Sequence, residues 1–264
     1  MTLLDTPTIA NTLGAANRFP DSCSANPPAA KALNVSASRN LAEATISRSI
    51  FLIYISTDYV FSGKPGEAPY LTTSPTNPPN TYGQTKLDGE NAVLEVAREA
   101  GVKNKVVILR VPLLYGKCDE PHQSAVNVLM SLLWTSQSIS PNDTRLKIDN
   151  YALRFPTNTS DVARVCRDLS KFYLNPPNST RDLPTTLHFS SEDRMTKWQI
   201  CQTFAEIMGL PLDGMEAFQP DDDPKDGVQR PYDCHLDISA LRHLGIDTST
   251  VNFTVWWYGG KYPT

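Results

Sequence analysis

The segment FLIYISTDYVFSG, residues 51–63, runs from a mostly apolar stretch into a group of hydroxyl, carboxyl and phenol side chains. A short continuous apolar run bounded by polar residues is typical of a strand buried in a parallel sheet. In open α/β sheets, ligands bind outside the carboxyl ends of the strands. The segment therefore predicts a core strand that ends either at a functional site or at an ordinary polar turn.

Helical and strand-like patterns alternate around this strand. The Ala-rich stretch at 27–48 and residues from about 83 to 99 have helical patterns, whereas KVVILRV at 105–111 has the pattern of a second buried strand. Strands separated by helices predict parallel βαβ units. The sequence therefore predicts an α/β fold with a parallel sheet flanked by helices.

The second half of the chain continues this pattern and then leaves it. Residues 160–172 predict a helix capped by Thr159 or Ser160, and TKWQ at 196–199 is a capping box that opens another helix. The alternation ends after about residue 190. We therefore expect two interleaved parts: residues 1–190 with the sheet, and residues 191–264 as a smaller C-terminal lobe.

Composition excludes several classes of function. The chain has 24 basic and 28 acidic residues and a net charge of -4, so it has no basic excess of the kind that nucleic-acid binders use. The five cysteines form no Cys-x-x-Cys pair, which argues against a zinc site or a disulfide framework. No apolar run approaches a membrane span. We expect a cytoplasmic protein without a metal site, acting neither on nucleic acid nor on membranes.

Tyr82 and Lys86 are the first candidates for chemistry. They stand four residues apart at the start of a predicted helix and therefore share one face. An ammonium beside a phenol lowers the pKa of the tyrosine, which would make Tyr82 an acid or base near neutral pH. Thr57, at the end of the neighbouring strand, could orient a substrate oxygen. The spacing alone is weak, because a tyrosine and a lysine on a helix are usually surface residues.

The order of the segments is more specific. A strand ending in STDYVF precedes Tyr82 and Lys86, and a strand ending in LRVPLLYG follows them. In this order the sequence resembles the extended short-chain dehydrogenase/reductase family. Two branches fit, the dTDP-4-dehydrorhamnose reductases and the regulatory β subunits of methionine adenosyltransferase. ISTDYVF and RFPT suit both, whereas YGQTKLDGENAVLE, RFPTNTSDVARVCRDL and HFSSEDRMTKWQICQTFAEIMGLP are more similar to the β subunits.

The resemblance implies a Rossmann-like fold, an NADP pocket and roles for particular residues. Thr57, Tyr82 and Lys86 would correspond to the family's catalytic hydroxyl, acid/base tyrosine and lysine, and Lys86 would also bind the nicotinamide ribose. The remaining cofactor contacts would come from two loops. These are the GAANRFPD loop, through Gly14, Ala15 and Arg18, and the loop after the next strand, through Pro112, Leu113 and Leu114. A turn glycine, a solvated arginine and an ordinary strand end are the alternative interpretations.

The sequence departs from the family pattern in its first part. Extended members begin with a strand, a Gly-x-x-Gly-x-x-Gly turn and a helix that hold the cofactor pyrophosphate. This glycine pattern does not occur in the sequence, and TPTIANTL at 6–13 is a poor substitute for the strand before GAANR. We therefore expect a truncated Rossmann-like sheet in which NADP binding is weak or lost.

Three functions are compatible with these observations. The first is a non-catalytic regulatory protein that binds the catalytic subunit of methionine adenosyltransferase, although the terminal NFTVWWYGGKYPT does not clearly match the partner-binding tail of the β subunits. The second is an NADPH-dependent reductase of a nucleotide-linked deoxysugar. The third is a truncated product without a function.

Overall fold

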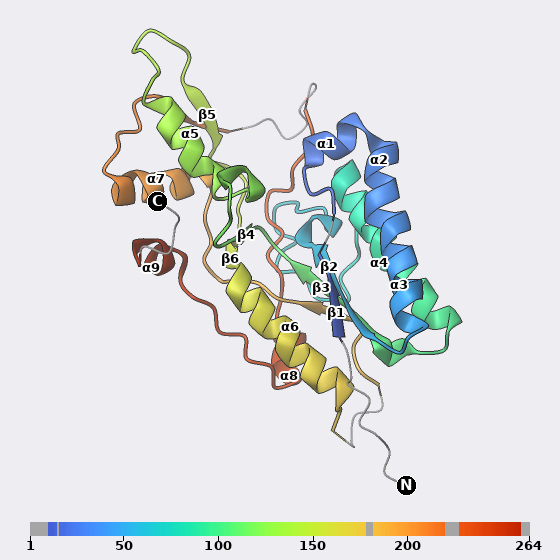
Figure 1. The fold of residues 1–264 in the computed structure, drawn as a ribbon. Helices are drawn as coiled ribbons and strands as arrows, with labels where there is room; N and C mark the ends of the chain where they lie inside the picture. Colours follow the sequence, from blue (N-terminus) through green and yellow to red (C-terminus); the bar gives the residue numbers. More distant parts are fainter. Residues whose placement is uncertain (1–9, 15, 178–181, 220–226, 260–264) are drawn as a thin grey trace.

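The computed structural model describes residues 10–14, 16–177, 182–219 and 227–259. Its main sheet has the strand order β1-β2-β3-β7, formed by β1 (Ala10–Leu13), β2 (Phe51–Thr57), β3 (Val106–Val111) and β7 (Thr186–His188) (Figure 1). All three pairings are parallel, and they place Thr57 opposite Val111. The carboxyl ends of β2 and β3 therefore lie side by side. The expected α/β fold with a parallel sheet is confirmed.

Helices cover both faces of this sheet. The side chains of its strands alternate between the two faces, and each face carries an apolar core that helices bury. Phe51 and Ile53 belong to the core under α6 (Thr159–Leu174), and α8 (Ser239–His243) joins the same core. Leu52 and Tyr54 belong to the core under α3 (Ala37–Ile46) and α4 (Thr81–Glu99) (Figure 1). Buried on both faces, β2 shows the continuous apolar pattern by which it was predicted.

The amino-terminal half contains further short elements. The stretch predicted as helical at 27–48 consists of α2 (Pro27–Lys31), a π-helical segment (Ala32–Ser36) and α3, preceded by α1 (Pro20–Ala25). Single-turn 3-10 helices follow β2 (Asp58–Val60) and precede β3 (Lys103–Lys105), and a third lies at Pro121–Gln123. The expected poor strand in TPTIANTL is present as β1, and residues 6–9 of that segment lie outside the described part of the chain.

A third apolar core lies beside the main sheet. It contains α5 (Val128–Ser136), α7 (Lys197–Met208), α9 (Phe253–Tyr258) and the two-stranded parallel sheet of β5 (Leu146–Asp149) and β8 (Met215–Phe218). A parallel pair of β4 (Leu114–Tyr115) and β6 (Thr157–Asn158) leads into it. The third core thus takes residues from both sides of residue 190, while α8 belongs to the core under α6.

Local capping signals were predicted with mixed success. The capping box of α7 is formed as expected, with Thr196 and Gln199 each bonding the backbone of the other. Helix α6 begins at Thr159, and its cap is Asn158, whose side chain accepts a hydrogen bond from the Ser160 N–H. The predicted cap, Thr159 or Ser160, was wrong because three consecutive residues can all cap a helix.

Within the described residues, no helix has the length and apolarity of a membrane span.

Candidate functional site

Thr57 and Tyr82 meet at the carboxyl end of β2. The Thr57 hydroxyl donates to Asp58 Oδ1 at 3.0 Å and accepts from the Tyr59 N–H at 3.2 Å. Helix α4 is capped by Asn80, and this start places the partly buried Tyr82 with its ring 5.7 Å from the ring of Tyr59. A hydrogen bond with Thr57 is among the influences on the pKa of Tyr82. The threonine hydroxyl and the tyrosine phenol are thus brought together.

Lys86 lies one turn further along α4 and is almost completely buried. Its Nζ donates to Tyr54 Oη at 2.8 Å and to the Ile55 carbonyl at 2.9 Å, and it lies 4.0 Å from the centroid of the Tyr54 ring. Burial lowers the pKa of Lys86 to about 8, and the nearby Glu90 carboxylate opposes this shift. The side chain to which Lys86 donates a hydrogen bond is therefore Tyr54, which the sequence did not indicate.

The pKa shift that the sequence predicted for Tyr82 differs in direction from the shift in the structure. Burial raises the pKa of Tyr82, the hydrogen bond with Thr57 lowers it, and the neighbouring Asp58 raises it further. The predicted lowering by Lys86 was wrong for this state of the protein, because the ammonium is bound to Tyr54 Oη and the Ile55 carbonyl. Tyr82 is a neutral phenol near pH 7, which can donate a proton but is a poor base.

The cofactor-binding candidates are spread over two loops. Pro112, Leu113 and Leu114 follow β3 directly and therefore lie at the same sheet edge as Thr57. Gly14 is exposed, with no heavy atom within 4 Å of the position where a Cβ would stand. Arg18 Nη2 donates to the Gln123 carbonyl, so this guanidinium already has a backbone partner. Ala15 lies outside the described residues.

A buried cation, Arg154, was not predicted as a site residue. Its Nη1 donates to the Leu153 carbonyl at 2.8 Å and to the Pro231 carbonyl at 3.0 Å, whereas its buried Nη2 has no hydrogen-bond partner within the described part of the chain. The guanidinium lies 5.7 Å from the ring of Tyr59. Burial raises the pKa of Asp58 to about 6, and Arg154 counteracts this shift.

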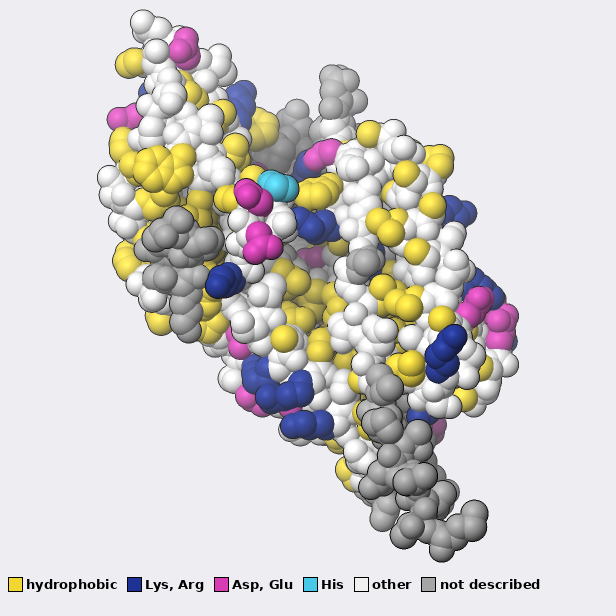
Figure 2. All heavy atoms as spheres, viewed as in Figure 1, with side chains coloured by type: hydrophobic (Ala, Val, Ile, Leu, Met, Phe, Trp, Pro, Cys, Tyr) yellow, Lys and Arg dark blue, Asp and Glu magenta, His cyan; other side chains and the backbone are white. Residues whose placement is uncertain are grey.

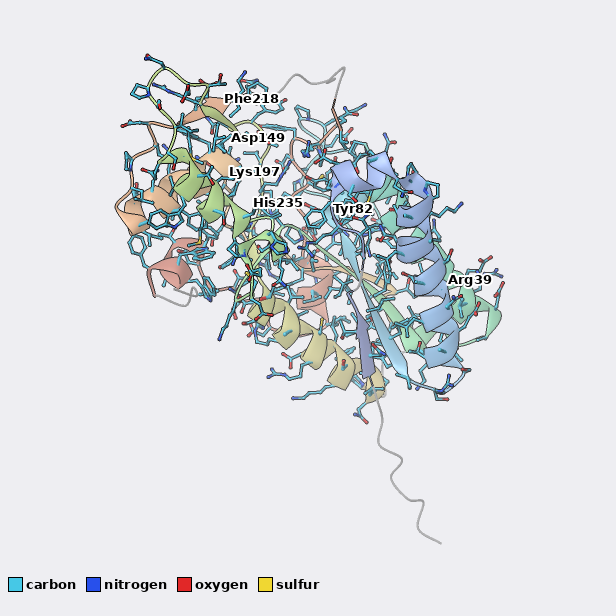
Figure 3. The ribbon with its side chains drawn as sticks, turned by 45° about the horizontal axis from the view of Figure 1, so that its top comes forward. Arg39, Tyr82, Asp149, Lys197, Phe218 and His235 are labelled. Carbon is cyan, nitrogen blue, oxygen red and sulfur yellow. The ribbon has the colours of Figure 1, made fainter. Side chains whose placement is uncertain are left out.

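Further cations act on the same region. Burial lowers the pKa of Lys197 to about 8, and the charges of Arg154 and Arg230 lower it as well. Figure 2 shows charged side chains and a histidine around a hollow between the two halves of the molecule. In Figure 3, Lys197, His235 and Tyr82 lie in the region between these halves, with Lys197 and His235 on the side of the third core. For Arg154, the only sequence signal of a site residue was the presence of an arginine inside the apolar stretch ALRFP, residues 152–156.

No cluster of three or more metal-ligating side chains occurs among the described residues. The acidic loop PDDDPKD, residues 220–226, lies outside them.

Comparison with known proteins defines the class of this chain. The profile of the RmlD substrate binding domain matches residues 6–253, and the chain belongs to this family. Solved structures share its fold. A dTDP-4-dehydrorhamnose reductase from Clostridium acetobutylicum has a TM-score of 0.74 at 24% identity over 95% of this chain and 79% of that one. The corresponding Bacillus anthracis protein, in complex with NADP, has a TM-score of 0.73 at 21% identity over 95% of this chain and 78% of that one.

Sequence relatives of this chain include β subunits of methionine adenosyltransferase 2 and a dTDP-4-dehydrorhamnose reductase. The chain is 39% identical over 236 residues to methionine adenosyltransferase 2 subunit beta of Rattus norvegicus, which covers 89% of this chain and 65% of the relative. The Xenopus laevis protein of that name is 36% identical over 92% of this chain and 68% of its own length. A Streptomyces griseus dTDP-4-dehydrorhamnose reductase is 42% identical over 36% of this chain and 30% of the reductase. The predicted resemblance to the family, and within it to the β subunits, is confirmed.

Proposed function

We propose that this chain is a non-catalytic regulatory protein of methionine adenosyltransferase that retains an NADP-type pocket at the carboxyl ends of β2 and β3. The observation that carries this proposal is the 39% identity to a β subunit over 89% of the chain. The chain spans 65% of the length of that relative. Its partner would be the catalytic subunit of that enzyme.

The pocket chemistry is compatible with a regulatory role. The Lys86 ammonium donates hydrogen bonds to Tyr54 Oη and the Ile55 carbonyl, and Tyr82 is a neutral phenol. A phenol and an ammonium in these positions can bind hydroxyl groups of a nicotinamide nucleoside without taking part in turnover. Residues Pro112, Leu113 and Leu114 would border the same pocket, and Gly14 and Arg18 would be its more distant contacts.

Copurification with the catalytic subunit tests the regulatory proposal. Tyr82→Phe removes one phenolic hydroxyl and barely changes the shape of the surface, so we expect wild type and variant to be retained equally. Tyr173→Phe, at a buried tyrosine that packs on Phe51 under the opposite face of the sheet, is the matched control. Failure of the folded wild-type chain to copurify would contradict the proposal.

A reductase of a nucleotide-linked deoxysugar is the second candidate, favoured by a different observation. The buried Arg154 has an unpartnered Nη2, and Lys197 experiences the charges of both Arg154 and Arg230. Unpaired buried cations are costly, and an anion such as the diphosphate of a nucleotide sugar would offset that cost. Thr57 would then orient the ketone, and the Tyr82 phenol would protonate the developing alkoxide.

Two measurements separate this candidate from the regulatory one. NADPH oxidation with a dTDP-4-keto sugar should fall by about 10²-fold or more in Tyr82→Phe if the tyrosine is the proton donor. Calorimetric titration with dTDP should show weaker binding to Lys197→Met than to wild type, whereas Lys171→Met, at an exposed position of α6, should bind like wild type. Turnover that depends on Tyr82, without copurification, would favour the reductase.

The third possibility, a product that does not fold, has its own test. A chain with the parallel sheet and the three apolar cores described above should unfold cooperatively in urea. A transition without cooperativity would favour a non-functional product and would contradict both other candidates.

A further inference from the structure

The ammonium of Lys86 has two acceptors that belong to one strand. Tyr54 Oη and the Ile55 carbonyl accept from Nζ at 2.8 Å and 2.9 Å, and the Tyr54 ring lies 4.0 Å from the ammonium. A lysine ammonium has three N–H donors and no acceptor. Two donors are therefore committed to β2, and one N–H has no partner among the described residues.

Tyr54 is itself fixed from a second element. Its side chain is completely buried, and its hydroxyl donates to the backbone carbonyl of Asn34 at 3.4 Å. Asn34 lies in the π-helical segment Ala32–Ser36, and its side chain bonds the Thr85 hydroxyl of α4 at 2.9 Å. Single π-helical turns occur frequently at functional sites.

The approach of these groups requires a glycine on α4. A Cβ at Gly89 would lie 2.3 Å from Tyr54 Oη and 2.4 Å from the Asn34 carbonyl oxygen. No side chain larger than hydrogen fits there without moving the tyrosine or the π-helical backbone. The space at Gly89 thus lets the hydroxyl of Tyr54 reach both Lys86 and Asn34.

The direction of the hydrogen bond between Lys86 and Tyr54 is fixed, because the ammonium can only donate and Tyr54 Oη therefore accepts from it. The Tyr54 hydroxyl donates to the Asn34 carbonyl, and Tyr54 also has a side-chain hydrogen bond with Ser38. Burial raises the pKa of Tyr54, so the phenol keeps that proton. The titratable groups around the pair are the Glu90 carboxylate, which acts on both Lys86 and Tyr54, and the phenol of Tyr82, which acts on Tyr54.

We propose that Tyr54 is a positioning residue for Lys86: its hydroxyl, set by the Asn34 carbonyl, fixes the ammonium so that a single N–H is left for a ligand hydroxyl. The identity of that ligand rests on the proposed NADP-type pocket. The positioning itself requires neither cofactor nor partner, so it is tested without them.

Titration of Lys86 in the full chain tests this role. In protein labelled with ¹³Cε-lysine, the Lys86 resonance is assigned by its loss in Lys86→Met, and its pKa is measured by NMR. Tyr54→Phe keeps the ring over the ammonium and removes the acceptor, so the pKa of Lys86 should fall by about one unit or more. Tyr173→Phe, which removes a hydroxyl from the core on the other face of the sheet, should leave it within about 0.2 units. An unchanged or raised pKa of Lys86 in folded Tyr54→Phe would overturn the proposal.

A second measurement does not depend on a substitution that the core must tolerate. In the chain labelled with 3-fluorotyrosine, the ¹⁹F resonance of Tyr54 should move with the same midpoint as the ¹³Cε resonance of Lys86, because the two groups share a hydrogen bond. A Tyr54 resonance that stays constant through the Lys86 titration would also overturn the proposal. Neither readout involves the methionine adenosyltransferase catalytic subunit, so failure here and failure of the proposed function are distinguishable.

Discussion

Arg110 of β3 and Glu90 of α4 form a buried ion pair with two hydrogen bonds, from Nε to Oε1 at 2.9 Å and from Nη2 to Oε2 at 2.7 Å. Both side chains are less than a tenth exposed, at 6% and 3%. Glu90 stands one turn after Lys86 on the same helix. The pair therefore ties the helix that carries Tyr82 and Lys86 to the sheet that carries Thr57.

Breaking this pair should destabilise the fold strongly. Arg110→Met leaves the Glu90 carboxylate buried without its partner, and we expect a loss of about 3–5 kcal/mol in the free energy of unfolding. Arg167→Met, which breaks an exposed pair with Asp168, should cost no more than about 1 kcal/mol. Urea denaturation measures both. Equal losses in the two variants would show that the buried pair does not hold α4 in place.

His188 should make the protein less stable in mild acid. Burial and the charge of Arg110 lower the pKa of His188 to about 4, from an ordinary value of 6.5. Between these values the unfolded chain binds a proton that the folded chain does not, so stability is lost as the pH falls from about 6.5 to about 4. The loss from this group reaches up to about 3 kcal/mol.

His188→Gln removes that proton binding. Its free energy of unfolding, measured in urea across this pH window, should therefore fall less steeply toward acid than that of wild type. Parallel curves would contradict the buried neutral state of the imidazole.

Asp58 should act in the opposite direction over part of the same window. Burial raises the pKa of Asp58 from 3.8 to about 6, so the folded chain binds a proton between these values more tightly than the unfolded chain does. The ionised carboxylate costs stability above about pH 6, and this cost disappears as the pH falls to about 4. Its size is up to about 3 kcal/mol.

Asp58→Asn keeps an acceptor for the Thr57 hydroxyl and removes the charge. The variant should therefore gain stability relative to wild type at pH 7.5 and lose that advantage at pH 4.5, by urea denaturation. A constant difference between the two proteins at both values would contradict the prediction.

Gly83 should not tolerate a methyl group. A Cβ there would lie 2.1 Å from the Tyr59 carbonyl oxygen, which is backbone, and 3.0 Å from Pro78 Cβ. Although alanine favours a helix interior by up to about 1 kcal/mol, Gly83→Ala should destabilise the fold by about 1–3 kcal/mol, because α4 must move away from the 3-10 helix Asp58–Val60. Gly14→Ala, where nothing lies within 4 Å, is the control and should change the melting temperature little.

The parts of the fold that sequence predicts are those set by local pattern. Strand β2 was recognisable because burial on both faces leaves a continuous apolar run, and helix α7 because its capping box leaves a short polar signal. The parallel pair β5 and β8 was not recognisable, because its strands have only four residues each and lie far apart in the chain.

The elements that carry the candidate residues were predictable from the sequence, and the contacts of these residues were not. The spacing of Tyr82 and Lys86 follows from helix geometry, but the partner of Lys86 is Tyr54, 32 residues earlier, inside an apolar run where a tyrosine looks like core. Arg154 likewise bonds a backbone carbonyl 77 residues away. Such long-range partners depend on tertiary packing, which a single sequence does not display.

The last prediction concerns the cofactor affinity of the 264-residue chain. Tyr82, Lys86 and the loop at 112–114 can contact only the nicotinamide half of NADPH, and the sequence has no Gly-x-x-Gly-x-x-Gly turn for the pyrophosphate. Calorimetric titration should therefore give a dissociation constant weaker than about 1 μM, which corresponds to less than about 8 kcal/mol of binding free energy. Lys86→Met should weaken any residual binding further, because the single free N–H of the ammonium is then absent, whereas Lys171→Met should bind like wild type. A submicromolar constant for wild type, unchanged in Lys86→Met, would mean that another segment of this chain binds the nucleotide and that the carboxyl ends of β2 and β3 are not its pocket.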